Sequence, residues 1–134
     1  MALLVPDVGE VYALKAFLNN TAATDPIIKL FATNVTPAET DTAGTYTEAA
    51  GGGYSTKAAL TGSSWTFTAG APSHGDFAQQ TYTFTGALTT NPTIFGYFMV
   101  ANTSGTLLWA EAFTSFTPAN NGDQILITPK ITAD

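Results

Sequence analysis

The sequence predicts a mainly β protein, an antiparallel β-sandwich with one short N-terminal helix. Three observations predict this fold. Thr occurs 24 times against 6 Ser, and Thr favours the pleated, half-buried surface of a sheet, as do aromatic residues. The 12 Gly and 7 Pro divide the chain into short segments. About seven of these segments have strand-like patterns at the spacing of a sandwich, without the strand–helix alternation of a parallel sheet.

The chain of 134 residues fits one domain over residues 1–134. A domain of this length buries roughly 68% of its unfolded surface and needs neither a metal ion nor a disulfide to form a core. With 45% hydrophobic residues, the composition is that of a folded protein.

The helix is expected over about residues 7–19. Asp7 is a favourable N-cap residue, and Glu10 follows three positions later, as in a capping box. Apolar residues recur at helical spacing, and the two asparagines at 19–20 end the segment. The apolar residues are Val8, Val11, Tyr12, Leu14, Phe17 and Leu18. Because their stripe is wide, we expect the helix to cover a sheet face or a groove between subunits.

The strands begin at about residue 26. They are expected at 26–33, 54–60, 64–69, 80–85, 94–101, 106–113 and 124–131, with loops at 34–43, 69–76 and 87–93. Pro129 indicates that the last strand runs along a sheet edge.

The strand at 94–101 is apolar on both faces, and it forms a hairpin with the strand at 106–113. Strict alternation groups Ile94 with Phe98 and Val100, and Phe95 with Tyr97 and Met99. The next strand has Leu107, Trp109 and Phe113 on one face. We therefore expect the helix or another subunit to cover the second face of 94–101.

Charge and composition exclude several classes of function. Four Lys and no Arg against ten acidic residues give a net charge of −6. This balance argues against nucleic acid and against an anionic membrane surface as partners. The absence of Cys excludes thiol catalysis and thiolate metal sites, and one His excludes a multi-histidine site within the chain.

No arrangement of residues indicates an enzyme, a metal site or a cofactor site. Ser73, His74 and Asp76 lie too close in sequence for triad geometry, and His74 is expected in an exposed loop. Glu39, Asp41 and Glu48 are interpreted as solvated loop acids rather than as a catalytic pair. We expect no catalytic residue, no cofactor and no bound metal.

Glu111 is the charge whose surroundings are least ordinary, because it lies between Trp109 and Phe113 on one strand face. If that face is buried, the carboxylate needs a partner. Four residues could supply one, within the chain or from a neighbour: Lys15, Lys29, Lys57 and Lys130. A solvent-exposed Glu111 is the alternative.

Five short segments resemble the small capsid decoration (cement) proteins of tailed bacteriophages. They are residues 5–10 (VPDVGE), 34–37 (NVTP), 51–54 (GGGY), 104–113 (SGTLLWAEAF) and 120–125 (NNGDQI). The resemblance implies a virion protein with a jelly-roll-like β-sandwich that forms a homodimer or homotrimer. It brings no catalytic residues with it.

On this resemblance we expect a viral structural protein that decorates and stabilises a capsid by binding the major capsid protein. The start of the chain lacks a basic segment before its apolar run, so we expect synthesis in the host cytoplasm and a final place on the capsid surface of the virion. The interface candidates are Tyr97, Met99, Trp109, Glu111 and Phe113. The alternatives are a phage tail, fibre or knob component, and a carbohydrate-binding β-sandwich module.

Overall fold

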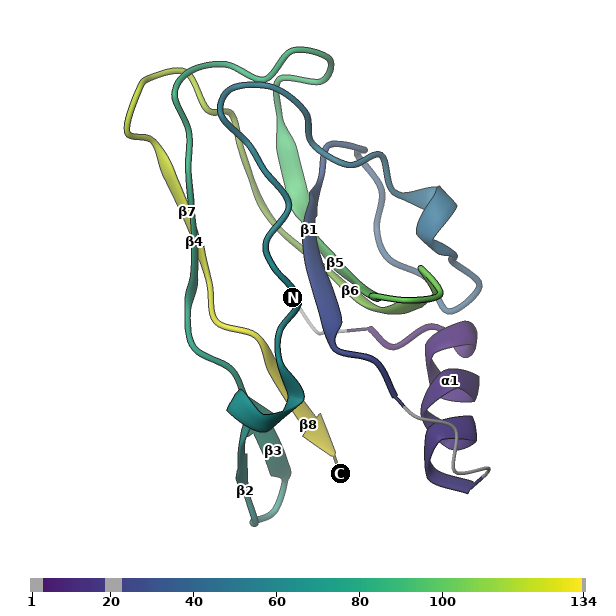
Figure 1. The fold of residues 1–134 in the computed structure, drawn as a ribbon. Coiled ribbons are helices and arrows are strands. Elements are labelled where there is room, and N and C mark those ends of the chain that lie inside the picture. The colour runs from purple at the N-terminus through teal and green to yellow at the C-terminus, as the bar shows by residue number, and fades with distance from the viewer. Residues whose placement is uncertain (1–3, 19–22, 134) are drawn as a thin grey trace.

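The computed structural model describes residues 4–18 and 23–133. These residues are mainly β, with three antiparallel sheets and one α-helix (Figure 1). The main sheet has the order β1-β5-β6, formed by Pro26–Phe31, Ile94–Ala101 and Leu107–Phe116. A smaller sheet, β2-β3-β8, is formed by Thr66–Thr68, Ser73–Asp76 and Lys130–Ala133. The third sheet pairs β4 (Gln80–Thr83) with β7 (Gln124–Ile127).

The expected strands at 26–33, 64–69, 80–85, 94–101 and 106–113 are each confirmed. Residues 54–60 contain no strand, and the expected loop at 69–76 contains β3. The last expected strand, 124–131, is divided at Thr128 and Pro129 into β7 and β8, which belong to different sheets. Proline lacks the N–H that would continue the β4–β7 ladder, so the chain leaves one sheet and joins another at this point.

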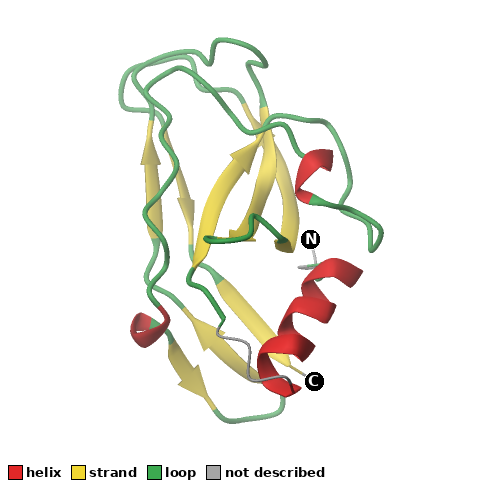
Figure 2. Cartoon of the chain, turned by 45° about the vertical axis from the view of Figure 1, so that its right-hand side comes forward, coloured by secondary structure: helices red, strands yellow, loops and turns green. Residues whose placement is uncertain are grey.

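The larger core lies between the main sheet and the β4–β7 pair, which stand as two layers in Figure 2. Ile28, Leu30 and Met99 of the main sheet are fully buried there. The facing pair contributes Tyr82, Ile125 and Ile127, and Phe84, directly after β4, packs beside them. Interdigitation of these side chains removes both inner faces from water, which is the main favourable term in folding.

The second face of the main sheet is covered by residues 34–46 of the same chain, so the expected cover by the helix or another subunit was wrong. Tyr46 stacks on Phe98 of β5 with ring centroids 5.2 Å apart, and it lies 4.9 Å from the ring of Phe31. Val35 and Ala43, at the start of the 3₁₀ turn Ala43–Thr45, pack against the same cluster. A loop that carries its own aromatic residue therefore completes this smaller core.

Two register shifts change the expected faces of the central hairpin. One lies between Ile94 and Gly96, so Ile94 packs in the larger core and Phe95 packs on the opposite side. The second lies opposite Leu108, so Leu107 and Trp109 enter different cores. An extra residue at a β-bulge reverses the face of every residue beyond it, which strict alternation does not anticipate.

Helix α1 spans Asp7–Leu18 and packs against β6. The Pro6 carbonyl accepts hydrogen bonds from the N–H groups of Gly9 and Glu10, so Pro6 occupies the N-cap position that was expected for Asp7. The expected end at residues 19–20 lies outside the described residues. Gly9 allows the close approach to β6, because a Cβ there would lie 2.3 Å from the Leu108 carbonyl oxygen.

Candidate functional site

A groove of about 1000 Å³ lies between α1 and the β2-β3-β8 sheet. Figure 2 shows these two elements on opposite sides of the lower part of the molecule. The helix contributes small residues together with Tyr12, the sheet side contributes aromatic residues, and β6 provides the floor. The lining includes Gly9, Tyr12, Ala13, Ala16, Trp65, Phe67, His74, Leu108, Trp109 and Ile131.

Aromatic side chains on the sheet side of the groove pack against one another. The ring of Trp65 lies 5.3 Å from that of Phe77 and meets Trp109 edge-on at 6.3 Å. Phe67 lines the same side, and 77% of its surface is exposed to solvent. A large apolar side chain held open beside an apolar groove is a feature of binding surfaces.

Polar groups on both sides of the groove have partners within the chain. The Tyr12 hydroxyl accepts a hydrogen bond of 2.9 Å from the N–H of Thr24. Ser73 Oγ donates to the Gly70 carbonyl at 3.1 Å. Because these groups are engaged, the groove presents a largely apolar surface to a partner.

His74 lies on β3 and is half-buried, so the exposed loop position expected for it was wrong. Its Nε2 lies 3.1 Å from Oδ2 of Asp76, two residues along the same strand. Lys130 on the neighbouring strand β8 lies 3.9 Å from Oδ1 of that carboxylate. These three residues form a polar cluster at the edge of the groove, and the Ser73 hydroxyl bonds to Gly70 rather than to His74.

Three of the five predicted interface residues belong to the core. Tyr97, Met99 and Trp109 have at most 6% of their surface exposed, so they have little area with which to contact a partner. Phe113 is partly buried against the same core. Trp109 also forms part of the groove floor, and it is the one predicted interface residue among those that line the groove.

Glu111 is paired by a tyrosine and not by one of the four lysines considered. The Tyr97 hydroxyl donates to Glu111 Oε2 at 2.8 Å. Burial, together with the hydrogen bond and the charge of Glu111, raises the pKa of Tyr97 well above its usual value. The indole Nε1 of Trp109, on β6, is buried without a hydrogen-bond partner among the described residues.

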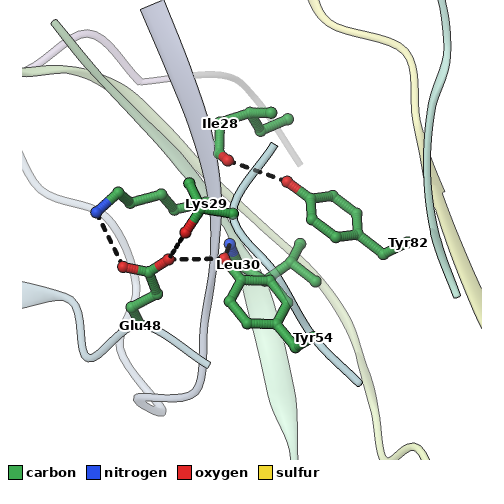
Figure 3. A network of polar contacts seen from close by, with 7 residues as sticks. Ile28, Lys29, Leu30, Glu48, Tyr54 and Tyr82 are labelled. Carbon is green, nitrogen blue, oxygen red and sulfur yellow. Dashed lines mark hydrogen bonds and ion pairs between the residues drawn. The ribbon is translucent and has the colours of Figure 1, made fainter. Parts of the chain in front are cut away.

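A second polar network closes the free edge of β1 (Figure 3). Glu48 accepts hydrogen bonds of 2.9 Å from Lys29 Nζ and from the Tyr54 hydroxyl. The Tyr54 oxygen in turn accepts from the Leu30 N–H at 3.2 Å, and the Tyr82 hydroxyl donates to the Ile28 carbonyl at 3.0 Å. Side chains thus satisfy the backbone groups that an edge strand would otherwise expose.

The backbone of residues 47–60 seals the same edge. Ala49 N–H donates to the Leu30 carbonyl at 2.9 Å, and Leu60 N–H donates to the Pro26 carbonyl at 2.7 Å. Glu48 is therefore a structural group inside this network and not the solvated loop acid that the sequence indicated. The edge of β1 is occupied by the chain itself and is closed to strand addition by a partner.

Hydrogen bonds and charge hold the pKa of Glu48 below its usual value. Burial alone would raise it. Hydrogen bonds from Thr56, Lys29 and Tyr54, together with the positive charge of Lys29, outweigh burial and lower the pKa. The ionised carboxylate is thus the form that the network requires.

The outer face of α1, opposite the groove, carries apolar side chains open to solvent. Val8, Val11, Leu14 and Leu18 are between 37% and 69% exposed. The sequence identified this stripe, but its position on the outside of the molecule depends on which face packs against β6. Phe67 was missed for a similar reason, because alternation places it beside Trp65 and does not show that the groove remains open.

Among residues 4–18 and 23–133, no three His, Asp or Glu side chains are grouped to hold a metal ion. Within the same ranges, no helix has both the length and the hydropathy to cross a bilayer. Comparisons with protein-family models, with curated proteins and with solved structures found no match.

Proposed function

We propose that this chain is a viral structural protein that decorates and stabilises a bacteriophage capsid by binding the major shell protein as a homo-oligomer. The groove between α1 and the β2-β3-β8 sheet is the observation that carries the proposal. It receives an apolar segment of the shell protein, with Phe67 at its open side. The sequence segments that resemble capsid decoration proteins supply the identity of the partner.

The chemistry of the groove favours a protein partner. Depletion of charge and enrichment of aromatic residues are typical of the central part of protein interfaces, and both features mark the groove. Three of the four lysines are engaged inside the chain: Lys29 with Glu48, Lys57 with the Thr81 carbonyl, and Lys130 with Asp76. Docking therefore depends on apolar contact and shape rather than on charge.

Because a shell offers many equal sites, a modest interface per copy is sufficient for stable attachment of the whole layer. When linked copies bind to a lattice of neighbouring sites, each further contact forms at high effective concentration. The groove of a single copy can therefore be weak while the assembled layer is stable.

The proposed role also implies a particular type of fold. We propose that the packed layers of the main sheet and the β4–β7 pair form a β-sandwich of the jelly-roll-like kind. The buried side chains shared by the two layers support this arrangement. A stiff sandwich would hold α1 and β2 at a fixed separation, which a docking groove requires.

The carbohydrate-binding alternative is less well supported by the groove. Aromatic rings such as Trp65 can stack on sugar faces, but sugar hydroxyls also need free hydrogen-bonding groups, and those of Tyr12, Thr24 and Ser73 are engaged internally. A tail, fibre or knob component would dock through the same apolar groove. It would differ from a decoration protein in the number of copies per virus particle.

Phe67→Ser tests the groove directly. Purified protein is titrated onto shell particles that lack this chain, and bound protein is measured after sedimentation. We expect about tenfold weaker binding, because an exposed aromatic side chain that becomes buried contributes several times the thermal energy. Leu126→Ser is the matched control, since Leu126 is 52% exposed on β7 and lies away from the groove.

Both variants should unfold at the same temperature as the parent within a few degrees, because both side chains are exposed in the monomer. Equal binding by all three proteins would contradict docking through the groove. Failure of the parent to bind any shell particle would contradict the proposed function itself.

A further inference from the structure

We propose that the outer face of α1 pairs with α1 of a second copy of this chain, in parallel orientation around a two-fold axis. The pairing deepens the homo-oligomer of the proposed function, and it rests on the helix alone rather than on the groove. The helix lies at the edge of the molecule and packs against β6 (Figures 1 and 2). The groove lies on the inner side of the helix.

Helix α1 is apolar on both sides. Gly9, Tyr12, Ala13 and Ala16 face the groove and β6. Val8, Val11, Leu14 and Leu18 occupy the outer face and remain exposed. A surface helix normally has one apolar stripe, which faces the core, so a second apolar stripe that is open to solvent marks a contact surface.

The spacing of the outer residues is that of a coiled-coil seam. Val11 and Leu18 are seven residues apart, and Leu14 lies between them, which gives a, d and a positions of a heptad. In parallel coiled coils, Val at a with Leu at d favours two strands over three or four. On this register Val8 and Lys15 occupy e positions, and Glu10 occupies a g position.

Charge complementarity identifies the occupant as a second copy and sets its direction. In a parallel pair, the g residue of one helix meets the e residue five positions later on the other. Glu10 of one copy therefore meets Lys15 of the next, and two-fold symmetry forms the pair twice. In an antiparallel pair, g positions face g positions and e positions face e positions. Glu10 and Lys15 of the two copies would then not come together.

Both charged side chains are available for this contact. Glu10 and Lys15 are exposed, and neither has an ion-pair partner among residues 4–18 and 23–133. The helix is already ordered on β6, so pairing does not carry the entropic cost of forming it.

The seam is short, and the resulting dimer is expected to be weak. The helix has 12 residues, and one face of it covers less than the ~800 Å² per partner of a stable complex. Asp7 occupies the d position that precedes Val11, so two carboxylates meet at the N-terminal end and oppose a longer seam. We expect a dimer that dissociates on dilution and becomes stable when copies are held side by side on a lattice.

Sedimentation equilibrium of the full chain over a range of concentrations measures the dimer. Leu14→Glu should give a monomer throughout, while Leu126→Glu, on an exposed strand position outside α1, should behave as the parent. Glu10→Lys and Lys15→Glu should each weaken the dimer about tenfold, since each replaces two attractions by two repulsions. The double variant Glu10→Lys with Lys15→Glu should restore the dimer to within about twofold of the parent.

The direction of the helices is tested by a single cysteine, because the chain has none of its own. In a parallel pair the two Leu14 positions meet at the axis, so Leu14→Cys should form a disulfide-linked dimer on mild oxidation. Leu126→Cys should remain monomeric under the same conditions. Cross-linking of both variants to the same extent would overturn the parallel pair.

A parent chain that is monomeric at every concentration, with Leu14→Glu losing its binding to shell particles, would overturn self-pairing and assign the face to the shell protein. A monomeric Leu14→Glu variant that still binds particles through the groove would support the pairing and leave the proposed function intact.

Discussion

The hydroxyl of Tyr97 donates a 2.8 Å hydrogen bond to Oε2 of Glu111, the residue directly opposite it on the neighbouring strand. The pair joins β5 to β6 at a point where Trp109 and Phe113 flank the carboxylate. It explains how an acidic side chain is accommodated on the core side of the main sheet. A partly buried carboxylate with one strong donor depends heavily on that donor.

Tyr97→Phe should lower the free energy of unfolding by about 1–3 kcal/mol, because it removes the donor and leaves the acceptor partly buried. Urea unfolding followed by tryptophan fluorescence measures the loss. Glu111→Gln is the matched comparison, since the amide oxygen still accepts from Tyr97, and its cost should be the smaller of the two. The opposite order would show that the charge of Glu111, and not the hydrogen bond, stabilises this part of the sheet.

Glu48 should make stability depend on pH. Its pKa is lower in the folded chain than its usual value of 4.5. The unfolded state therefore binds the proton more tightly, so the stabilisation by Glu48 is fully present above pH 4.5. This stabilisation is lost as the pH falls through the folded pKa.

Glu48→Gln should consequently destabilise the chain at pH 7 and differ less from the parent at pH 3. Unfolding midpoints in urea at the two pH values measure the difference. Glu39→Gln is the control, because Glu39 is an exposed loop acid, and it should shift neither midpoint appreciably. A constant deficit of Glu48→Gln across this pH range would contradict an ionised Glu48 at the centre of the network.

Gly9→Ala should destabilise the contact of α1 with β6. Alanine favours the helix itself, but its Cβ would lie 2.3 Å from the Leu108 carbonyl oxygen. Displacement of the helix should cost about 1–3 kcal/mol and should also weaken particle binding through the groove.

Gly44→Ala provides the comparison for this variant. Its nearest atom, Thr42 Oγ1, would be 3.7 Å from the new Cβ, so its unfolding midpoint should match that of the parent. Equal stability of the Gly9 and Gly44 variants would show that the helix can move away from β6 without cost.

The sequence was informative where a local pattern decides the structure. Apolar periodicity from Val8 to Leu18 locates the helix, and the apolar run at Ile94 with the following turn locates the central hairpin. It was misleading where one extra residue changes a face, as at Leu108, opposite the step from Met99 to Val100. The cover provided by Tyr46 depends on the path of a loop, which no local pattern specifies.

The groove could be predicted only in part. The aromatic content and the low charge indicated a binding surface, but three of the residues chosen for it were core residues. The positions of Phe67 and β3 beside the groove could not be predicted from local patterns. They depend on the pairing of β3 with β8, which lies some 55 residues later in the chain. Glu48 shows the same limit, since its partners come from β1 and from two positions beyond the glycine run at 51–53.

The proposed decorating role is tested most directly by quantitative mass spectrometry of virus particles purified on density gradients from the source culture. The proposed function predicts a copy number equal to that of the major shell protein or a simple fraction of it. Only a handful of copies per particle would contradict a decorating role and favour a tail or fibre component. Absence of the chain from purified particles would contradict a virion protein altogether.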